Sequence, residues 1–371
     1  MRTPTAGGIH AAEERPSPPG TRVLSAYPVA LSSDFEAITD VISRAGKEHA
    51  GSVFPFAAVL NRLRALRRSW RLFVMSAQYA GVITVGDLEG LAFAALLRLR
   101  GRTAPVHVMY DCLWYGGGRL RQSWMRFCLA GVDRCIVWAS VEKQRYARAY
   151  RLESSKFAFV PHHHTMKHYS WESGDDGYIF TGGNADRDFA PLFAAVRELG
   201  FPCVLATNRR QLLRNLDIPH NVRVVSVSPS EFRQLMAKAR MVVMPMRATL
   251  LHAGAQQSIL NAMLMGKPVV LTDVEGGADY IESGKTGVLT PYGDVGALRE
   301  SIRELWQDPE AARAMGARGR EFAFAMTVER TNNEMWELAL RLIQEKGKPG
   351  APVADHGSRD FRLDRHEHDC S

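Results

Sequence analysis

The sequence is poor in cysteine and has no long apolar run, and both shortages restrict its class. Five of the 371 residues are cysteine and no Cys-x-x-Cys pair occurs, which predicts reduced thiols in a cytoplasmic protein rather than a disulfide framework. The most apolar stretch, 82–99, is interrupted by Asp87, Glu89 and Arg98, so we do not expect it to cross a membrane. No Asp-x-Asp pair directly follows a predicted strand, so nothing suggests a divalent metal site there.

The two ends of the chain lack the pattern of a packed core. Residues 1–20 contain several prolines and glycines, so we expect disorder there and neither a signal peptide nor a transit helix. Residues 346–371 are rich in proline, glycine and charge, and we expect disorder there too. The remainder, in a chain that is 46% hydrophobic, is long enough for two cores of about 150 residues each.

Short apolar runs alternate with amphipathic segments along both halves of this remainder. Such alternation predicts an α/β fold with two doubly wound parallel sheets. We expect a first domain at 21–161, a polar linker at 162–177, a second domain at 178–326 and a terminal helix at 327–345. In the first domain the predicted strands are 22–26, 72–74, 81–85, 106–110, 134–140 and 157–161, and the predicted helices are 35–46, 57–70, 88–99 and 141–150.

The excess of positive over negative charge is confined to the first half of the chain. Residues 1–160 contain 22 Lys and Arg against 12 Asp and Glu, whereas residues 161–371 contain 25 against 27. Leu63, Leu66 and Trp70 lie among five arginines at helical spacing, which is typical of a basic amphipathic helix. We weigh equally a solvated helix face and a surface that contacts an anionic membrane or an acidic acceptor. Nucleic acid binding is disfavoured because no nucleic-acid-reading module accompanies the charge.

The most informative segment, 254–287, reads GAQQSILNAMLMGKPVVLTDVEGGADYIESGKTG. It predicts a helix with one apolar face, a buried strand at 268–272, and a glycine-rich turn into a second helix. A helix that opens at Gly254 and Ala255 would present free backbone N–H groups and a partial positive charge. Such an end binds phosphate readily, so we place the ligand there.

Several ordered motifs resemble the GT-B retaining glycosyltransferases of group 1, also called family four. The similarity covers roughly residues 176–340, and it is weak in the first half of the chain. The matching motifs are Tyr178-Ile179-Phe180-Thr181-Gly182-Gly183, Arg187-Asp188, Val242-Val243-Met244-Pro245, Asn261-Ala262-Met263, Gly266-Lys267-Pro268-Val269-Val270, Thr272-Asp273, Gly276-Gly277, Asp279-Tyr280-Ile281 and Gly284-Lys285-Thr286-Gly287.

This resemblance implies two Rossmann-like domains that face a cleft, with the terminal helix returning to the first domain. It implies that the second domain binds a nucleotide-sugar donor and that the first, basic domain binds an acceptor hydroxyl. The acceptor class stays open between a glycan, a lipid-linked saccharide and a small metabolite. The implied reaction is a hexosyl transfer that retains the anomeric configuration and needs no metal or other cofactor, in the cytoplasm or at the inner face of the cell membrane.

The resemblance also assigns donor-binding residues. Gly182 and Gly183 form the glycine turn, and Arg187 would contact the diphosphate, the alternative being a solvated arginine at a helix start. The family's two donor-site glutamates are replaced by Ala253 and Asn261, of which Asn261 can still accept a ribose hydroxyl. The remaining candidates for the diphosphate or the sugar are His252, Gly254, Ala255, Gln256, Gln257 and Ser258. For Gln256 and Ser258, helix capping is an equal alternative.

In the first domain, Asp111 follows a predicted strand where the family often has a His-Asp pair, and Tyr110 takes the histidine position. We therefore keep Asp111 as a catalytic candidate beside the acceptor. Because both glutamates are lost, the rival function is a weakly active or silent GT-B protein that binds a nucleotide sugar as a regulatory subunit. A metal site at 162–164 is disfavoured, since adjacent side chains of an extended segment point in opposite directions.

Overall fold

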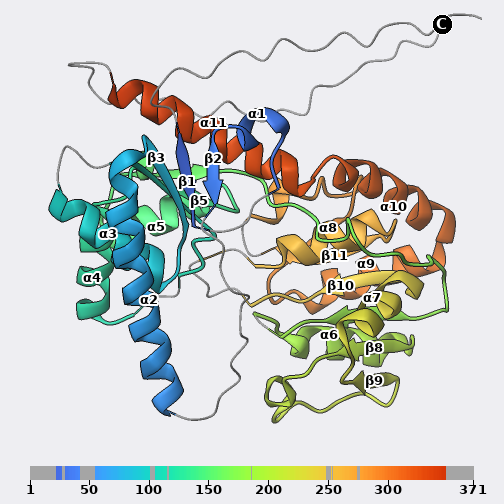
Figure 1. Cartoon of the computed structure of the whole chain (residues 1–371). Helices are drawn as coiled ribbons and strands as arrows, with labels where there is room; N and C mark the ends of the chain where they lie inside the picture. The colour runs from blue at the N-terminus through green and yellow to red at the C-terminus, as the bar shows by residue number, and fades with distance from the viewer. Residues whose placement is uncertain are drawn as a thin grey trace, which may run out of the picture.

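A computed structural model describes residues 22–26, 30–41, 55–100, 105–114, 117–184, 186–247, 252, 254–273 and 276–347 (Figure 1). Within these ranges the chain forms two α/β domains, each built on a six-stranded sheet whose strand pairs are all parallel. The predicted disordered segment 1–20 lies outside the described residues, as do residues 348–371 of the predicted tail 346–371, whose first residue, Lys346, is instead the last residue of a helix.

The first sheet has the strand order β2-β1-β3-β4-β5-β6. Its strands are β1 (Val23–Ser25), β2 (Thr39–Val41), β3 (Gly81–Val85), β4 (Val106–Tyr110), β5 (Arg134–Val137) and β6 (Phe157–Phe159). The helices of this domain are α1 (Ser33–Glu36), α2 (Pro55–Met75), α3 (Leu88–Arg100), α4 (Arg119–Leu129) and α5 (Glu142–Tyr150). Successive strand side chains point to opposite faces, so Val82 packs with α2 and α3 while Ile83 faces the other side.

The second sheet has the strand order β12-β11-β10-β7-β8-β9. Its strands are β7 (Ile179–Gly182), β8 (Cys203–Ala206), β9 (Val222–Val225), β10 (Met241–Met244), β11 (Val269–Asp273) and β12 (Val288–Pro291). Helices α6 (Phe189–Leu199) and α9 (Val295–Gln307) cover one face, and α7 (Pro229–Lys238) and α8 (Gln256–Leu264) cover the other. Helix α10 (Pro309–Phe324) packs against α8 and α9.

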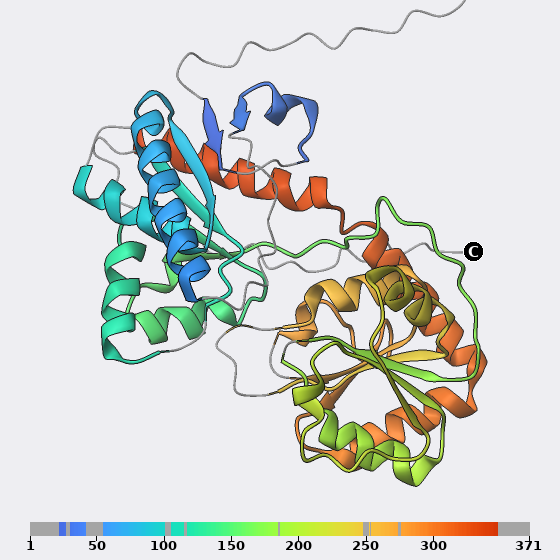
Figure 2. The same ribbon diagram turned by 60° about the horizontal axis from the view of Figure 1, so that its bottom comes forward.

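The last helix, α11 (Val328–Lys346), crosses from the second domain onto the first (Figures 1 and 2). Met335, Trp336 and Ala339 are buried in the core of the first sheet, on the face opposite α2 and α3. The indole of Trp336 also donates a hydrogen bond to Thr39 Oγ1 at 2.8 Å. Helix α11 therefore supplies the apolar cover that one face of the first sheet would otherwise lack.

The predicted fold class is confirmed by the two parallel sheets and their flanking helices. Three local predictions are wrong. Residues 72–74 are the last turn of α2 and not a strand, because the helix continues into an apolar run without a breaker. The predicted helix 35–46 is replaced at 39–41 by β2, and 42–46 lies outside the described residues. The second helix after the glycine-rich turn is only a 3-10 turn, Gly277–Asp279.

No helix in the part of the chain that the structure describes is long and apolar enough to span a membrane. Cys112, Cys128, Cys135 and Cys203 are buried free thiols, and Cys370 lies outside the described residues. Burial raises the pKa of Cys203 to about 12, so this thiol stays protonated at neutral pH.

Candidate functional site

The carboxyl edges of the two sheets are joined by three hydrogen bonds between the domains. The hydroxyl of Tyr280, in the second domain, donates to Trp138 O at 2.5 Å and accepts from His162 N at 2.9 Å. Asp279 Oδ2 accepts from Ser140 N, in the loop after β5, at 2.7 Å. Ligand sites of α/β sheets lie at this edge, so we define the domain interface as the region where these loops meet.

Arg187 lies beneath the glycine turn that follows β7. Its side chain donates from Nε to Gly182 O at 3.0 Å and from Nη1 to Met246 Sδ at 2.9 Å, and the residue is only 5% exposed. Gly183 has a φ of 124°, and a Cβ there would lie 3.2 Å from Arg187 Nε. Burial lowers the pKa of Arg187 to about 10, which keeps the guanidinium charged at neutral pH.

Arg187 is therefore not the solvated helix-start residue of the alternative interpretation. The start of α6 is instead capped by Asp188, whose carboxylate accepts a hydrogen bond from Ala190 N. The buried guanidinium is a fixed positive charge directly under the turn that the sequence analysis assigned to diphosphate binding.

His252 is the second buried polar group here, and it pairs with Asp186. The distance from His252 Nε2 to Asp186 Oδ2 is 3.2 Å. Burial lowers the pKa of His252, while Asp186 acts in the opposite direction. Arg145 and Asp111, both in the first domain, also influence the pKa of His252 through their charges. His252 thus lies close to the domain interface, although neighbouring Ala253 is outside the described residues.

Helix α8 begins beside this pair. Its N-cap, Ala255, has a φ of 76° and makes no side-chain capping hydrogen bond. A Cβ on Gly254 would lie 2.9 Å from Met246 Cε and 3.7 Å from Asp186 Oδ2, so the chain enters α8 in close contact with the Asp186 region. The methyl side chain of Ala255 offers no oxygen to the first N–H groups, and Gln257 is exposed. The first backbone N–H groups of α8 therefore have no cap from their own helix start.

Asn261 connects α8 to the linker. Its Oδ1 accepts from Thr165 N at 2.9 Å, and its Nδ2 donates to Thr165 Oγ1 at 3.0 Å. The hydroxyl of Thr165 also lies 3.5 Å from Oδ1, so this long contact takes the second acceptor position of the amide oxygen.

Asp111 directly follows β4 and has a left-handed backbone conformation, with a φ of 53°. Its Oδ1 accepts from the indole of Trp138 at 3.2 Å, and the Trp138 ring lies 4.7 Å from the His162 ring. Non-glycine residues rarely adopt this conformation, and where they do the surrounding structure holds them in place. Asp111 is thus fixed at the domain interface.

The structure brings Gly182, Gly183, Arg187, His252 and Gly254 into one cluster at the start of α8. Sequence analysis missed three partners: Asp186, Thr165 and Tyr280. An Asp-x-Asp pattern at 186–188 was present, four residues after β7, but its two carboxylates make separate contacts with His252 and the start of α6. Among the described residues, no group of three potential metal ligands converges.

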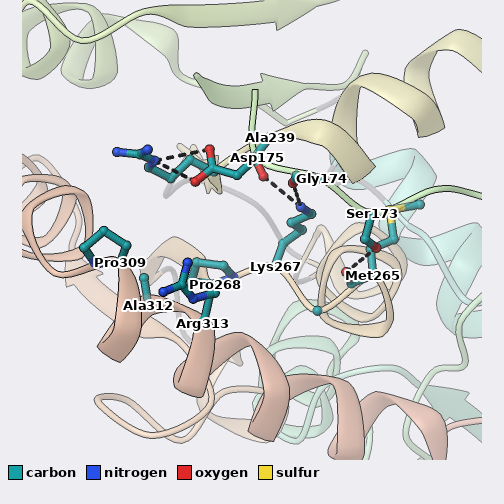
Figure 3. Close-up of a pocket in the computed structure, with 12 residues that line it drawn as sticks. Ser173, Gly174, Asp175, Ala239, Met265, Lys267, Pro268, Pro309, Ala312 and Arg313 are labelled. Carbon is teal, nitrogen blue, oxygen red and sulfur yellow. Dashed lines mark hydrogen bonds and ion pairs between the residues drawn. The ribbon is translucent and has the colours of Figure 1, made fainter. Parts of the chain in front are cut away.

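A separate cavity of about 320 Å³ lies at the amino edge of the second sheet, away from the domain interface (Figure 3). Lys267 crosses it and donates from Nζ to Gly174 O and Ala239 O, at 2.5 and 2.8 Å. Arg240 pairs with Asp175 at the same edge. These side chains are satisfied by the protein itself, so they hold the linker against the strands.

Residues 172–308 match the sequence model of the family described as glycosyl transferases group 1. The fold is similar to that of sucrose-phosphate synthase from Thermosynechococcus elongatus, with a TM-score of 0.65 and 17% identity over 87% of this chain and 99% of that one. Residues 172–308 are therefore similar to glycosyltransferase group 1, and the two-domain fold is that of GT-B glycosyltransferases.

Two further similar proteins are informative. HepE of Anabaena, solved with UDP, aligns with a TM-score of 0.62 and 13% identity over 86% of this chain and 99% of that one. The D-rhamnosyltransferase WbpZ of Pseudomonas aeruginosa is 35% identical over 60 residues, a stretch that covers 16% of each protein. The GT-B fold is thus shared over nearly the whole chain, while close sequence similarity is confined to a short segment.

Proposed function

We propose that this chain transfers a sugar from a nucleotide-diphosphate sugar to an acceptor hydroxyl with retention of configuration. The observation that carries the proposal is the uncapped start of α8, which adjoins Gly254 and the Asp186 region at the domain interface. Free N–H groups at a helix start bind phosphate oxygens. Support also comes from the group 1 match over 172–308 and from HepE, which is similar in fold and was solved with UDP and with UDP-glucose.

In this proposal the diphosphate lies between the α8 start and the turn at Gly182 and Gly183. Backbone N–H groups of α8 and the Arg187 charge stabilise the negative charge that develops as the sugar leaves. The bond from the anomeric carbon to the diphosphate oxygen breaks, and a bond to the acceptor oxygen forms on the same face. The acceptor proton passes to the leaving diphosphate oxygen. The protein charges carry this role, so we propose that no metal is required.

Sugar recognition is assigned to the neighbourhood of His252. A carboxylate is absent at position 253, and Asp186 provides one from a different loop, held against His252 Nε2. Gln256 and Gln257 lie at the start of the adjacent helix and complete the proposed polar surroundings of the sugar. Asn261 Oδ1 would accept a ribose hydroxyl in place of its 3.5 Å contact with the Thr165 hydroxyl.

The acceptor is placed on the first domain, at Asp111. This carboxylate directly follows β4 and is oriented by the Trp138 indole. It would accept a hydrogen bond from the incoming hydroxyl and so position it. A glycan, a lipid-linked saccharide and a small metabolite all present such a hydroxyl, and we place the reaction in the cytoplasm.

The proposal is tested by titrating the protein with UDP, GDP and ADP sugars and then measuring turnover with and without a chelator. We expect one nucleotide to bind and its sugar to be hydrolysed or transferred at a rate that the chelator does not change. Tight binding without turnover would support the rival function of a silent regulatory subunit. Binding of none of the nucleotides would reject both functions.

A further inference from the structure

Two helices of the first domain expose apolar side chains instead of burying them. In α2, Leu63 and Trp70 are each 57% exposed, and Leu60, Leu66 and Val74 are also exposed. The residues of α2 that face the core are Ala65, Ser69 and Leu72. At 100° per residue, the exposed set falls within one sector of about 120°. Helix α2 therefore presents an unpartnered apolar stripe to its surroundings.

Helix α4 repeats this arrangement. Leu120 is 90% exposed, and Trp124 and Phe127 follow it at spacings of four and three residues, which places all three on one face. The rings of Trp124 and Phe127 stack at 6.0 Å. On the core side, Met125, Cys128 and Leu129 are buried in the first domain. This helix was not predicted from the sequence, because its outward face is apolar and its remaining exposed positions are mostly charged.

Arginines border both stripes. In α2, Arg62 lies on one side of the stripe and Arg64 and Arg71 lie on the other, while Arg67 lies within the stripe near the Arg71 side. In α4, Arg121 lies on one side and Arg119 and Arg126 lie on the other. Neither helix contains an acidic residue. Arg98 of α3 extends the basic border, with its guanidinium carbon 4.5 Å from the centre of the Phe127 ring.

The two stripes belong to the same side of the domain. Helices α2 and α4 both pack against α3, and all three cover the same face of the first sheet (Figure 1). Helix α4 follows β4 antiparallel to it, and α2 runs antiparallel to β3, so both helix starts lie at the carboxyl edge of the sheet. The exposed Leu63 and Leu120 are therefore near the edge that forms the domain interface.

We infer that α2 and α4 dock this protein onto an anionic lipid surface. Leucine and tryptophan on one face with arginine at its borders is the pattern of helices that lie in a membrane interface. The apolar side chains enter the boundary between headgroups and acyl chains, tryptophan favours that depth, and the arginines remain at the anionic headgroups. A protein partner would have to supply both a large apolar face and acidic groups around it. A lipid leaflet supplies both without further specificity.

The inference does not rest on the proposed glycosyl transfer, because docking is measured without substrate. The full-length protein is floated with phosphatidylcholine vesicles that contain or lack phosphatidylglycerol, at low and high salt. We expect flotation only with the anionic vesicles and a loss of flotation at high salt.

Three sets of variants locate the surface. Leu63→Ser with Trp70→Ser, and separately Leu120→Ser with Trp124→Ser, should each weaken vesicle binding at least about tenfold. Removing one arginine, as in Arg67→Gln, should weaken it about fivefold. The matched control is Phe324→Ser, which changes a residue that is 72% exposed on α10 of the second domain and should leave binding unchanged. All these positions are exposed, so thermal unfolding should shift little.

Several results would overturn the inference. One is a wild-type protein that fails to float with anionic vesicles, and another is flotation that the α2 and α4 variants do not change. A third is a wild-type dimer that the same variants convert to a monomer without any effect of lipid, which would assign the two stripes to a second copy of the chain.

Discussion

The hydrogen bonds of Tyr280 across the domain interface allow a quantitative test. The Tyr280→Phe substitution keeps the buried ring, which is 1% exposed, and removes the hydroxyl. It deletes the bond to Trp138 O at 2.5 Å and the bond from His162 N at 2.9 Å. Each such bond contributes about 0.5–1.5 kcal/mol net, so the free energy of unfolding should fall by about 1–3 kcal/mol.

The matched control is Tyr178→Phe. Its hydroxyl makes one hydrogen bond, to Leu235 O at 2.8 Å, inside the second domain. We expect this variant to lose only about 1 kcal/mol. Burial raises the pKa of both Tyr280 and Tyr178, so both hydroxyls stay protonated near neutral pH. The difference in stability between the two variants should therefore not depend on pH between about 6 and 8.

The assay combines urea denaturation with amide hydrogen exchange. In Tyr280→Phe, exchange at the amide of His162 should accelerate because its acceptor is gone, while Tyr178→Phe should leave that amide unchanged. If the two variants were equally stable and the His162 amide were protected in both, the contact between the domains would not exist in solution and the arrangement of the site would have to be rejected.

Three further predictions address the site and the core. Gln257→Glu adds a negative charge in the first turn of α8, which stabilises the helix but repels a diphosphate bound there. UDP binding measured by calorimetry should therefore weaken about tenfold. If Gln257→Glu bound UDP as tightly as the surface control Gln307→Glu, the proposed phosphate site would be contradicted. Gly183→Ala would place a Cβ against the Arg187 guanidinium at a φ of 124°, so the free energy of unfolding in urea should fall by about 1–3 kcal/mol. Gly177→Ala should lower it less, because that position has only an unfavourable φ of 72° and no close neighbour. Burial lowers the pKa of His107 from 6.5 to about 3, so on acidification the unfolded chain binds a proton at this residue before the folded protein does. The free energy of unfolding should therefore fall by about 2 kcal/mol as the pH falls from 6.5 to about 5. Replacement by Gln should flatten that slope, and an unchanged slope would show that His107 is not the group responsible.

Much of the fold was predictable because strands buried on both faces of a parallel sheet are nearly continuous apolar runs. The strands at 81–85, 106–110 and 269–273 are such runs, and each is bounded by glycine, proline or charged residues. The error at 72–74 arose from the same rule, since Leu72, Phe73 and Val74 resemble a strand when the helix before them is not seen to continue. A local apolar run therefore predicts a strand reliably only where glycine, proline or charged residues bound it.

The glycine turns and the apolar helix face that carry the resemblance to group 1 are local features, so the sequence alone could predict helix α8 and the proposed ligand end of it. Which residues contact the start of α8 and the domain interface could be known only from the tertiary structure. Asp186 and His252 are 66 residues apart in sequence, Thr165 and Asn261 are 96 apart, and Tyr280 and Trp138 are 142 apart. No local spacing relates these residues, since their contacts depend on strand order and on the position of one sheet against the other.

The sequence by itself predicted an α/β chain with a basic first half and a helix start in the second half that we propose binds phosphate. Only the tertiary structure decided that Arg187 is buried under the glycine turn and that the apolar residues of α2 face outward. A helical pattern identifies an apolar face and its charged borders. Whether that face turns toward the core or away from it depends on what the other helices and the sheet have already covered.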